Sequence, residues 1–128
     1  MPIILHLTPR AQWETAQTVG FQTAESLQTQ GFIHCSTAAQ VVKVANKHYR
    51  SQNAALVLLC IDTDKLTSSY KFEPPINPKT GEYEPTADEK YPHIYGTINL
   101  DSVVQVVDFP ANPDGLFSLP EAIKNSGF

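Results

Sequence analysis

AALVLLCID, residues 54–62, is the longest apolar run in the chain and the stretch that decides its fold. The run has the length of a strand, and the polar residues Asn53 and Asp62 mark its ends. An unbroken apolar run, unlike an alternating one, is typical of a strand that is covered on both faces. We therefore predict that this segment is the central strand of the protein.

Segments on either side predict an α+β arrangement, with helices early in the chain and strands late. One helix is predicted over residues 9–19, with Thr8 as its N-cap and a proline at its first position. A second helix follows Thr37, where Gln40 completes a capping-box pattern. Residues 21–30 are polar and predict an irregular connection. Short apolar or alternating segments predict strands at residues 3–7, 32–36, 68–73, 93–98 and 103–107.

Residues 74–92 differ in composition from the rest of the chain. They include five prolines and four acidic residues, namely Pro74, Pro75, Pro78, Pro85, Pro92, Glu82, Glu84, Asp88 and Glu89. Such a segment has few backbone donors and little apolar surface to pack as a helix or strand. We predict a long loop, of the kind that often serves as a lid or a disordered insertion. The whole chain, residues 1–128, has the size of a single domain.

Composition and charge narrow the classes of partner. A formal net charge of −4 argues against nucleic acid, because phosphate backbones attract clustered Lys and Arg. No apolar run reaches the roughly 18 residues that cross a bilayer, and the N-terminus shows no export signal. We therefore expect a cytoplasmic protein with a small-molecule partner. Cys35 and Cys60 lie in apolar runs without metal-type spacing, which predicts buried, reduced thiols.

Histidines recur on the polar faces of three predicted strands. Alternate side chains of a strand point to opposite faces, so each histidine has predictable companions. The expected sets are Ile4, His6 and Thr8; Phe32, His34 and Ser36; His93, Tyr95 and Thr97; and, on a fourth strand, Lys71 with Glu73. Exposed sheet faces usually carry Thr, Lys and Glu. Three histidines among hydroxyl and phenol groups therefore indicate a shared ligand cleft over the sheet.

Three kinds of chemistry are open for this cleft. Nucleophilic catalysis by Ser36 or Cys35 is the least favoured, because the chain has no GxSxG elbow and Cys35 points to the apolar side. Imidazoles with the Glu73 carboxylate suit a transition metal, although the histidines lack HxxxH or HxH spacing. The third kind is a nucleotide-like ligand held by His and Ser, with its ring stacked on Tyr95 or Phe32.

Four stretches of the sequence carry a resemblance to a known family: ILHLTPRAQWETA, GFIHCSTAAQVVKVAN, LVLLCID and YPHIYGTI. In this order and spacing they resemble the small bacterial family known as domain of unknown function 952, over residues 3–109. That family has no established activity. The resemblance implies a fold similar to the ADP-ribosyltransferases, with split antiparallel β-sheets that hold NAD between them and, here, two N-terminal helices.

The resemblance also implies roles for individual residues. In that superfamily a first-strand His or Arg binds the adenine-side ribose, a Tyr or Ser-containing strand holds nicotinamide, and a late-strand Glu orients the reacting ribose. His6 matches the first position, and GFIHCST matches the second. His93 and Tyr95 stand where the glutamate is usual, and Glu73 comes from the preceding strand.

From these patterns we expect a site in which three residues act in catalysis, namely His34, Glu73 and His93. We expect four more to bind the ligand, namely His6, Ser36, Thr37 and Tyr95. No metal ligand is assigned. NAD is the expected ligand or substrate, either of an active transferase or of a binding module without turnover.

Overall fold

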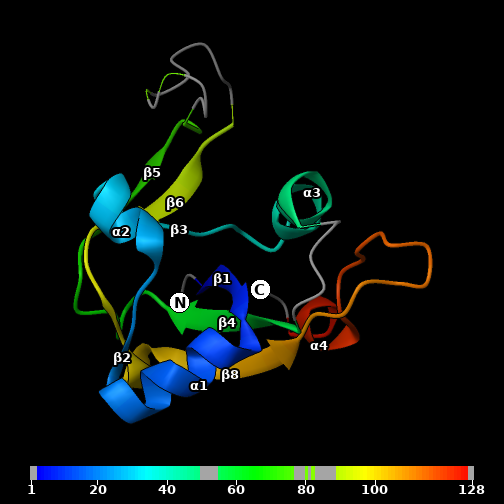
Figure 1. The fold of residues 1–128 in the computed structure, drawn as a ribbon, viewed down its shortest axis with the longest axis horizontal. Helices are drawn as coiled ribbons and strands as arrows, with labels where there is room; N and C mark the ends of the chain where they lie inside the picture. Colours follow the sequence, from blue (N-terminus) through cyan, green and yellow to red (C-terminus); the bar gives the residue numbers. More distant parts are fainter. Residues whose placement is uncertain (1–2, 50–54, 77–79, 81, 83–88, 127–128) are drawn as a thin grey trace.

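The computed structural model, which describes residues 3–49, 55–76, 80, 82 and 89–126, has an α+β fold (Figure 1). Its strands are β1 (Ile3–Pro9), β2 (Phe21–Gln22), β3 (Ile33–His34), β4 (Leu56–Asp62), β5 (Tyr70–Glu73), β6 (Tyr91–Ile94), β7 (Ile98–Asn99) and β8 (Val103–Asp108). They form three antiparallel sheets: a central sheet in the order β1-β4-β8, an outer sheet in the order β3-β6-β5, and a short sheet of β2 and β7. The α-helices of the described residues are α1 (Arg10–Val19), α2 (Glu25–Thr29), α3 (Val41–His48) and α4 (Glu121–Lys124).

Strand β4 lies in the middle of the central sheet, as its sequence predicts, and all of its seven residues are buried. Alternate side chains of β4 enter two separate apolar clusters. One cluster contains Leu59 and is completed by α1 and the outer sheet through Trp13 and Ile94. The other contains Leu58 and is completed by α3 and α4, through residues such as Ala45 and Ile123. Both faces of the central sheet are therefore covered.

The two predicted helices are present, but neither N-terminus is capped as the sequence suggests. Pro9 rather than Thr8 is the N-cap of α1, and the Thr8 hydroxyl donates to the Gln12 amide oxygen at 3.4 Å. Helix α3 begins at Val41, after one turn that starts at Thr37. Half of the capping box is formed there, since the Thr37 backbone N–H donates to Oε1 of Gln40 at 3.1 Å.

Two predicted segments are wrong in detail. Residues 21–30, expected to be irregular, contain β2 and α2, so three helices rather than two precede β4. Residues 93–98, expected to be one strand, divide into β6 and β7 with a bend at Gly96. At this bend the chain approaches Ser68 so closely that a Cβ on Gly96 would lie 2.4 Å from the Ser68 hydroxyl oxygen. Close approach of this kind is a known reason for glycine in an interrupted strand.

The outer sheet has one apolar and one polar face, as strand alternation predicts. Ile33 and Ile94 enter the core cluster with Trp13, whereas their neighbours in sequence point the other way. Strand β1 departs from this expectation, because the central sheet is covered on both sides. His6 and Thr8 of β1 are buried and have no exposed polar face.

The predicted loop over residues 74–92 falls partly outside the described residues, at 77–79, 81 and 83–88. Its last two predicted positions belong to β6, which starts at Tyr91. Among the described residues no helix has the length and apolarity that a membrane crossing requires.

Candidate functional site

The candidate site lies on the polar face of the outer sheet, where four aromatic rings pack together. Phe32 stacks on His93 with 4.0 Å between ring centroids and 16° between planes. Phe32 also contacts the rings of His34 and Tyr95, at 4.9 and 5.6 Å. Strand register explains why the rings of His34 and His93 lie together, because the two residues are cross-strand partners. We call Phe32, His34, His93, Tyr95 and Glu73 the histidine cluster.

Glu73 is held in this cluster by two donors. Its Oε1 accepts hydrogen bonds from Nδ1 of His93, at 3.0 Å, and from the Tyr95 hydroxyl. The bond to a carboxylate requires the proton of His93 on Nδ1. Glu73 keeps a side-chain exposure of 19%, against 1% for His93. The carboxylate is therefore fixed in orientation by the buried His93 and the half-buried Tyr95, while part of it reaches solvent.

His93 itself is buried beneath the surface and bonds to Glu73. Burial lowers its pKa, and the Glu73 carboxylate opposes that effect through its hydrogen bond and charge. Desolvation is the larger of the two causes, so the ring favours the neutral form at neutral pH. His93 contacts Glu73 and stacks under the ring of Phe32, and its expected role in catalysis stays a prediction.

His34 is the member of the cluster that is exposed at the surface. Its Nε2 donates to the amide oxygen of Gln30 at 2.5 Å, so Nδ1 of the neutral ring is an acceptor, and none of the described residues donates to it. Burial of part of the ring, together with repulsion from His93, His6 and His48, lowers the pKa of His34 to about 4. His34 is therefore neutral near pH 7 and becomes a second donor only when it takes up a proton.

His6 is buried in the central sheet and bonds to the backbone of β3, and its expected contact with a ligand stays a prediction. Its Nδ1 donates to the backbone carbonyl of His34 at 3.0 Å, and its Nε2 accepts from the amide nitrogen of Gln22 at 3.4 Å. Burial lowers the pKa of His6, and the neutral form suits both bonds. The oxygen of the Gln22 amide, Oε1, is buried without a hydrogen-bond partner among the described residues. His6 thus positions the backbone of β3.

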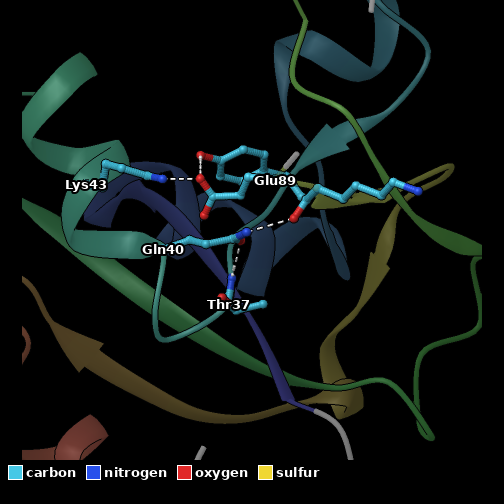
Figure 2. Close-up of polar contacts among 6 residues, drawn as sticks. Thr37, Gln40, Lys43 and Glu89 are labelled. Atoms are coloured by element: carbon cyan, nitrogen blue, oxygen red, sulfur yellow. Dashed lines mark hydrogen bonds and ion pairs between the residues drawn. The ribbon is translucent and has the colours of Figure 1, made fainter. Parts of the chain in front are cut away.

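Ser36 and Thr37, both expected to bind the ligand, connect β3 to other elements. The backbone of Ser36 exchanges two hydrogen bonds with Leu5 of β1, at 2.7 and 2.8 Å, and its side chain is buried. Thr37 begins the turn that leads into α3, as Figure 2 shows. Both residues therefore have structural roles, and their expected contacts with a ligand stay predictions.

A second polar cluster ties the chain before β6 to the start of α3 (Figure 2). The amide nitrogen of Gln40 donates to the Lys90 carbonyl at 2.7 Å. Lys43 pairs with Glu89, which also accepts a hydrogen bond from the Tyr91 hydroxyl at 3.2 Å. The side chain of Lys43 lowers the pKa of Glu89. Glu89 is therefore occupied in this contact, and Glu73 is the carboxylate at the histidine cluster.

We compared the sequence with models of known protein families. The model of a family described as proteins of unknown function, DUF952, matches residues 7–106. The chain belongs to this family. No curated protein matches the chain significantly.

The fold of this DUF952 protein is also found in solved structures. The crystal structure of the protein CC0527 from Caulobacter crescentus superposes with a TM-score of 0.78 at 25% identity, covering 96% of this chain and 99% of that one. A solution NMR structure of CC0527 gives a TM-score of 0.70 at 27% identity, covering 91% of each chain. A double mutant of CC0527, solved by crystallography, gives 0.78 at 24% identity. The likeness extends over nearly the whole fold.

Three further residues of this DUF952 protein matter at the site and are not predicted from its sequence. Gln30 and Gln22 fix the ring orientations of His34 and His6, and Lys71 lies over the ring of Tyr95. Glutamines in a polar segment give no periodic signal, and Gln22 lies in a stretch that the sequence predicts to be irregular. Lys71 is predicted to share a face with Glu73, but that pattern alone does not indicate its contact with Tyr95.

The alternative function, a metal site, was considered on the described residues of the DUF952 chain. No group of three or more His, Cys, Asp or Glu residues is arranged there to hold a metal ion. Cys35 and Cys60 are buried and reduced, and burial raises the pKa of Cys60 to about 11. Neither thiol is therefore activated as a nucleophile.

Proposed function

We propose that this DUF952 protein binds NAD or a related nucleotide-like ligand at the histidine cluster, and that its split antiparallel sheets correspond to those of the ADP-ribosyltransferases. The observation that carries the proposal is Glu73. A partly exposed carboxylate is oriented by His93 and Tyr95 on the sheet face that also carries the surface residue His34. That carboxylate provides an acceptor for ribose hydroxyls.

In an active transferase the same carboxylate would serve the reaction itself. The bond between nicotinamide and ribose breaks, nicotinamide leaves with the bonding electrons, and positive charge develops on the ribose. A negative group held in place, such as Glu73, stabilises that charge without having to reorganise. Water or an acceptor hydroxyl then attacks the same carbon, a new carbon–oxygen bond forms, and the proton of the attacking oxygen passes to solvent. His34 and Tyr95 orient the substrate, while His6 and His93 act as positioning residues.

A binding module that keeps the ligand without turnover is the second candidate function. It is favoured by the buried position of His93 and its bond to Glu73, because this imidazole supports the carboxylate rather than facing the surface. Both candidates require the ligand to contact Glu73 and His34. They differ in that only the active transferase cleaves the bond between nicotinamide and ribose.

Incubation with NAD, followed by chromatography for nicotinamide, separates these candidates. The active transferase releases nicotinamide, and we expect Glu73→Gln to lower that rate by about a hundredfold or more, as loss of a transition-state charge does. The binding module releases none but shows a higher melting temperature with NAD. Glu82→Gln, which removes a charge from a position outside the cluster, serves as the control. If the wild type releases no nicotinamide and its melting temperature does not rise with NAD, the proposed function is wrong.

A further inference from the structure

Three strands of the outer sheet carry His34, His93 and Lys71 side by side in one row. His93 of β6 is the cross-strand partner of His34 on one side and of Lys71 on the other. Cross-strand partners point to the same face, so all three side chains rise from the polar face. The middle one, His93, is buried, whereas His34 and Lys71 are exposed.

The ammonium of Lys71 faces the histidine cluster. Its Nζ lies 5.5 Å from the ring centroid of Tyr95, the residue whose hydroxyl donates to Glu73. A cation over an aromatic face gains a modest attraction and keeps its ability to donate hydrogen bonds. Among the described residues no ion pair occupies this ammonium. Lys71 is therefore a cation available to a ligand at the cluster.

The spacing of the row suits an anion with two charged ends. Neighbouring strands lie about 4.8 Å apart, so the backbones of His34 and Lys71 are separated by about 10 Å. A diphosphate presents oxygen atoms at both ends, and the long lysine side chain covers the remaining distance. A single phosphate is too short to contact both side chains unless each bends inward. Glu73 carries a negative charge on the same face, and it is already bonded to His93 and Tyr95.

We propose that His34 and Lys71 form an anion subsite for the diphosphate group of the ligand. This inference rests on the proposed function. It adds the residues that bind the diphosphate group of the ligand, for which the proposed function names no contact. With the diphosphate between His34 and Lys71, an adjoining ribose falls within reach of Glu73 in the next row of the sheet. The subsite thus links the charged and the sugar parts of one molecule.

Binding at this subsite is coupled to proton uptake by His34. Its Nε2–H already donates to Gln30, so a second N–H for the anion requires a proton on Nδ1. The ionisable groups around His34 come from three strands and α3, namely His6 of β1, Lys71 and Glu73 of β5, His93 of β6 and His48 of α3. The cations disfavour the proton, and both Glu73 and a bound diphosphate favour it. We therefore expect ADP-ribose, whose diphosphate diester keeps its charge in this range, to bind more tightly at about pH 5 than at about pH 7.

Calorimetric titration of the full chain with inorganic pyrophosphate, with NAD and with ADP-ribose tests the subsite. Lys71→Met removes the charge and keeps the length of the side chain, and Lys65→Met removes one lysine charge from an exposed turn as a matched control. We expect Lys71→Met to weaken binding of all three ligands by about tenfold or more, and Lys65→Met to change it by less than about twofold. His34→Gln should abolish the gain in ADP-ribose affinity at low pH.

The outcomes separate the subsite from the proposed function. If NAD binds and Lys71→Met binds it as tightly as the wild type, the subsite is wrong and the proposed function stands. If pyrophosphate binds in a Lys71-dependent manner but NAD does not bind, the subsite stands and the proposed function is wrong. If the wild type binds none of the three ligands, both are wrong.

Discussion

Three histidines with similar sequence surroundings reach three different environments in the folded protein. His6 is buried in the central sheet, His93 is buried beneath Phe32, and His34 meets solvent. All three have lowered pKa values, and in each case desolvation is the largest cause. Of the three, His34 is therefore the one that meets solvent, while His6 bonds to the backbone of β3 and His93 bonds to Glu73.

The shared direction of these shifts predicts acid sensitivity of the fold. A histidine whose folded pKa lies below its unfolded value of about 6.5 binds fewer protons when folded, so stability falls as the pH drops. For His34 the loss extends from about pH 6.5 down to its folded pKa of about 4. We expect the free energy of unfolding, measured with urea, to decrease over that interval.

The variant His34→Gln measures how much His34 contributes to the loss of stability at low pH. Because the side chain is exposed, we expect the variant to match the wild type within about 0.5 kcal/mol near pH 7. Its stability should then decrease less than that of the wild type on acidification. Equal losses in both proteins would show that His34 takes up its proton as easily in the folded chain as in the unfolded one.

At the scale of elements, the bend between β6 and β7 begins at Tyr95 of the histidine cluster and requires a glycine. Tyr95 lies just before Gly96, where the backbone approaches Ser68 too closely for any side chain. The Ser68 hydroxyl donates to the Thr97 carbonyl at 2.6 Å, so it is not free to move aside. The lack of a side chain at Gly96 is therefore required by the path of the chain.

Gly96→Ala should destabilise the protein by about 1 to 3 kcal/mol, the usual cost of forcing extra volume into a packed site. Thermal or urea unfolding measures this loss. A second substitution, Ser68→Gly, removes both atoms that the new Cβ would meet, so the double variant should recover most of the loss relative to Ser68→Gly alone. An unchanged midpoint for Gly96→Ala would contradict the close approach.

At the scale of the whole molecule, β4 contributes side chains to both apolar cores. Leu59 lies in the cluster shared with α1 and the outer sheet, and its neighbour Leu58 lies in the cluster shared with α3 and α4. Because one strand contributes to both clusters, loss of packing on either side disturbs the same backbone. We therefore expect one cooperative unfolding transition for the described fold.

Truncation on either face of β4 tests this expectation. Leu58→Ala and Leu59→Ala should each lower the free energy of unfolding by roughly 2 to 5 kcal/mol, since both side chains are fully buried. Val104→Ala, at an exposed position of β8, should change it by less than about 0.5 kcal/mol. Circular dichroism and tryptophan fluorescence, the latter reporting on Trp13, should give coincident transitions. Separate midpoints for the two probes would show that the two cores unfold independently.

The sequence by itself determined the elements whose signal is local. An unbroken apolar run specified the buried strand β4, helical spacing specified α1 and α3, and alternation specified the polar face that carries His34, His93 and Glu73. The sequence did not specify β2 and α2, because two residues and five residues are too short for a periodic pattern to be read.

Only the tertiary structure decided which of the polar residues lie at the surface and which of them meet. Burial of His6 depends on the layers that cover both sides of β1, and no pattern within β1 records those layers. The row of His34, His93 and Lys71 depends on the register between strands far apart in the chain. Register follows from packing of the apolar face against the core, so the alignment of the polar face is set by residues on its opposite side.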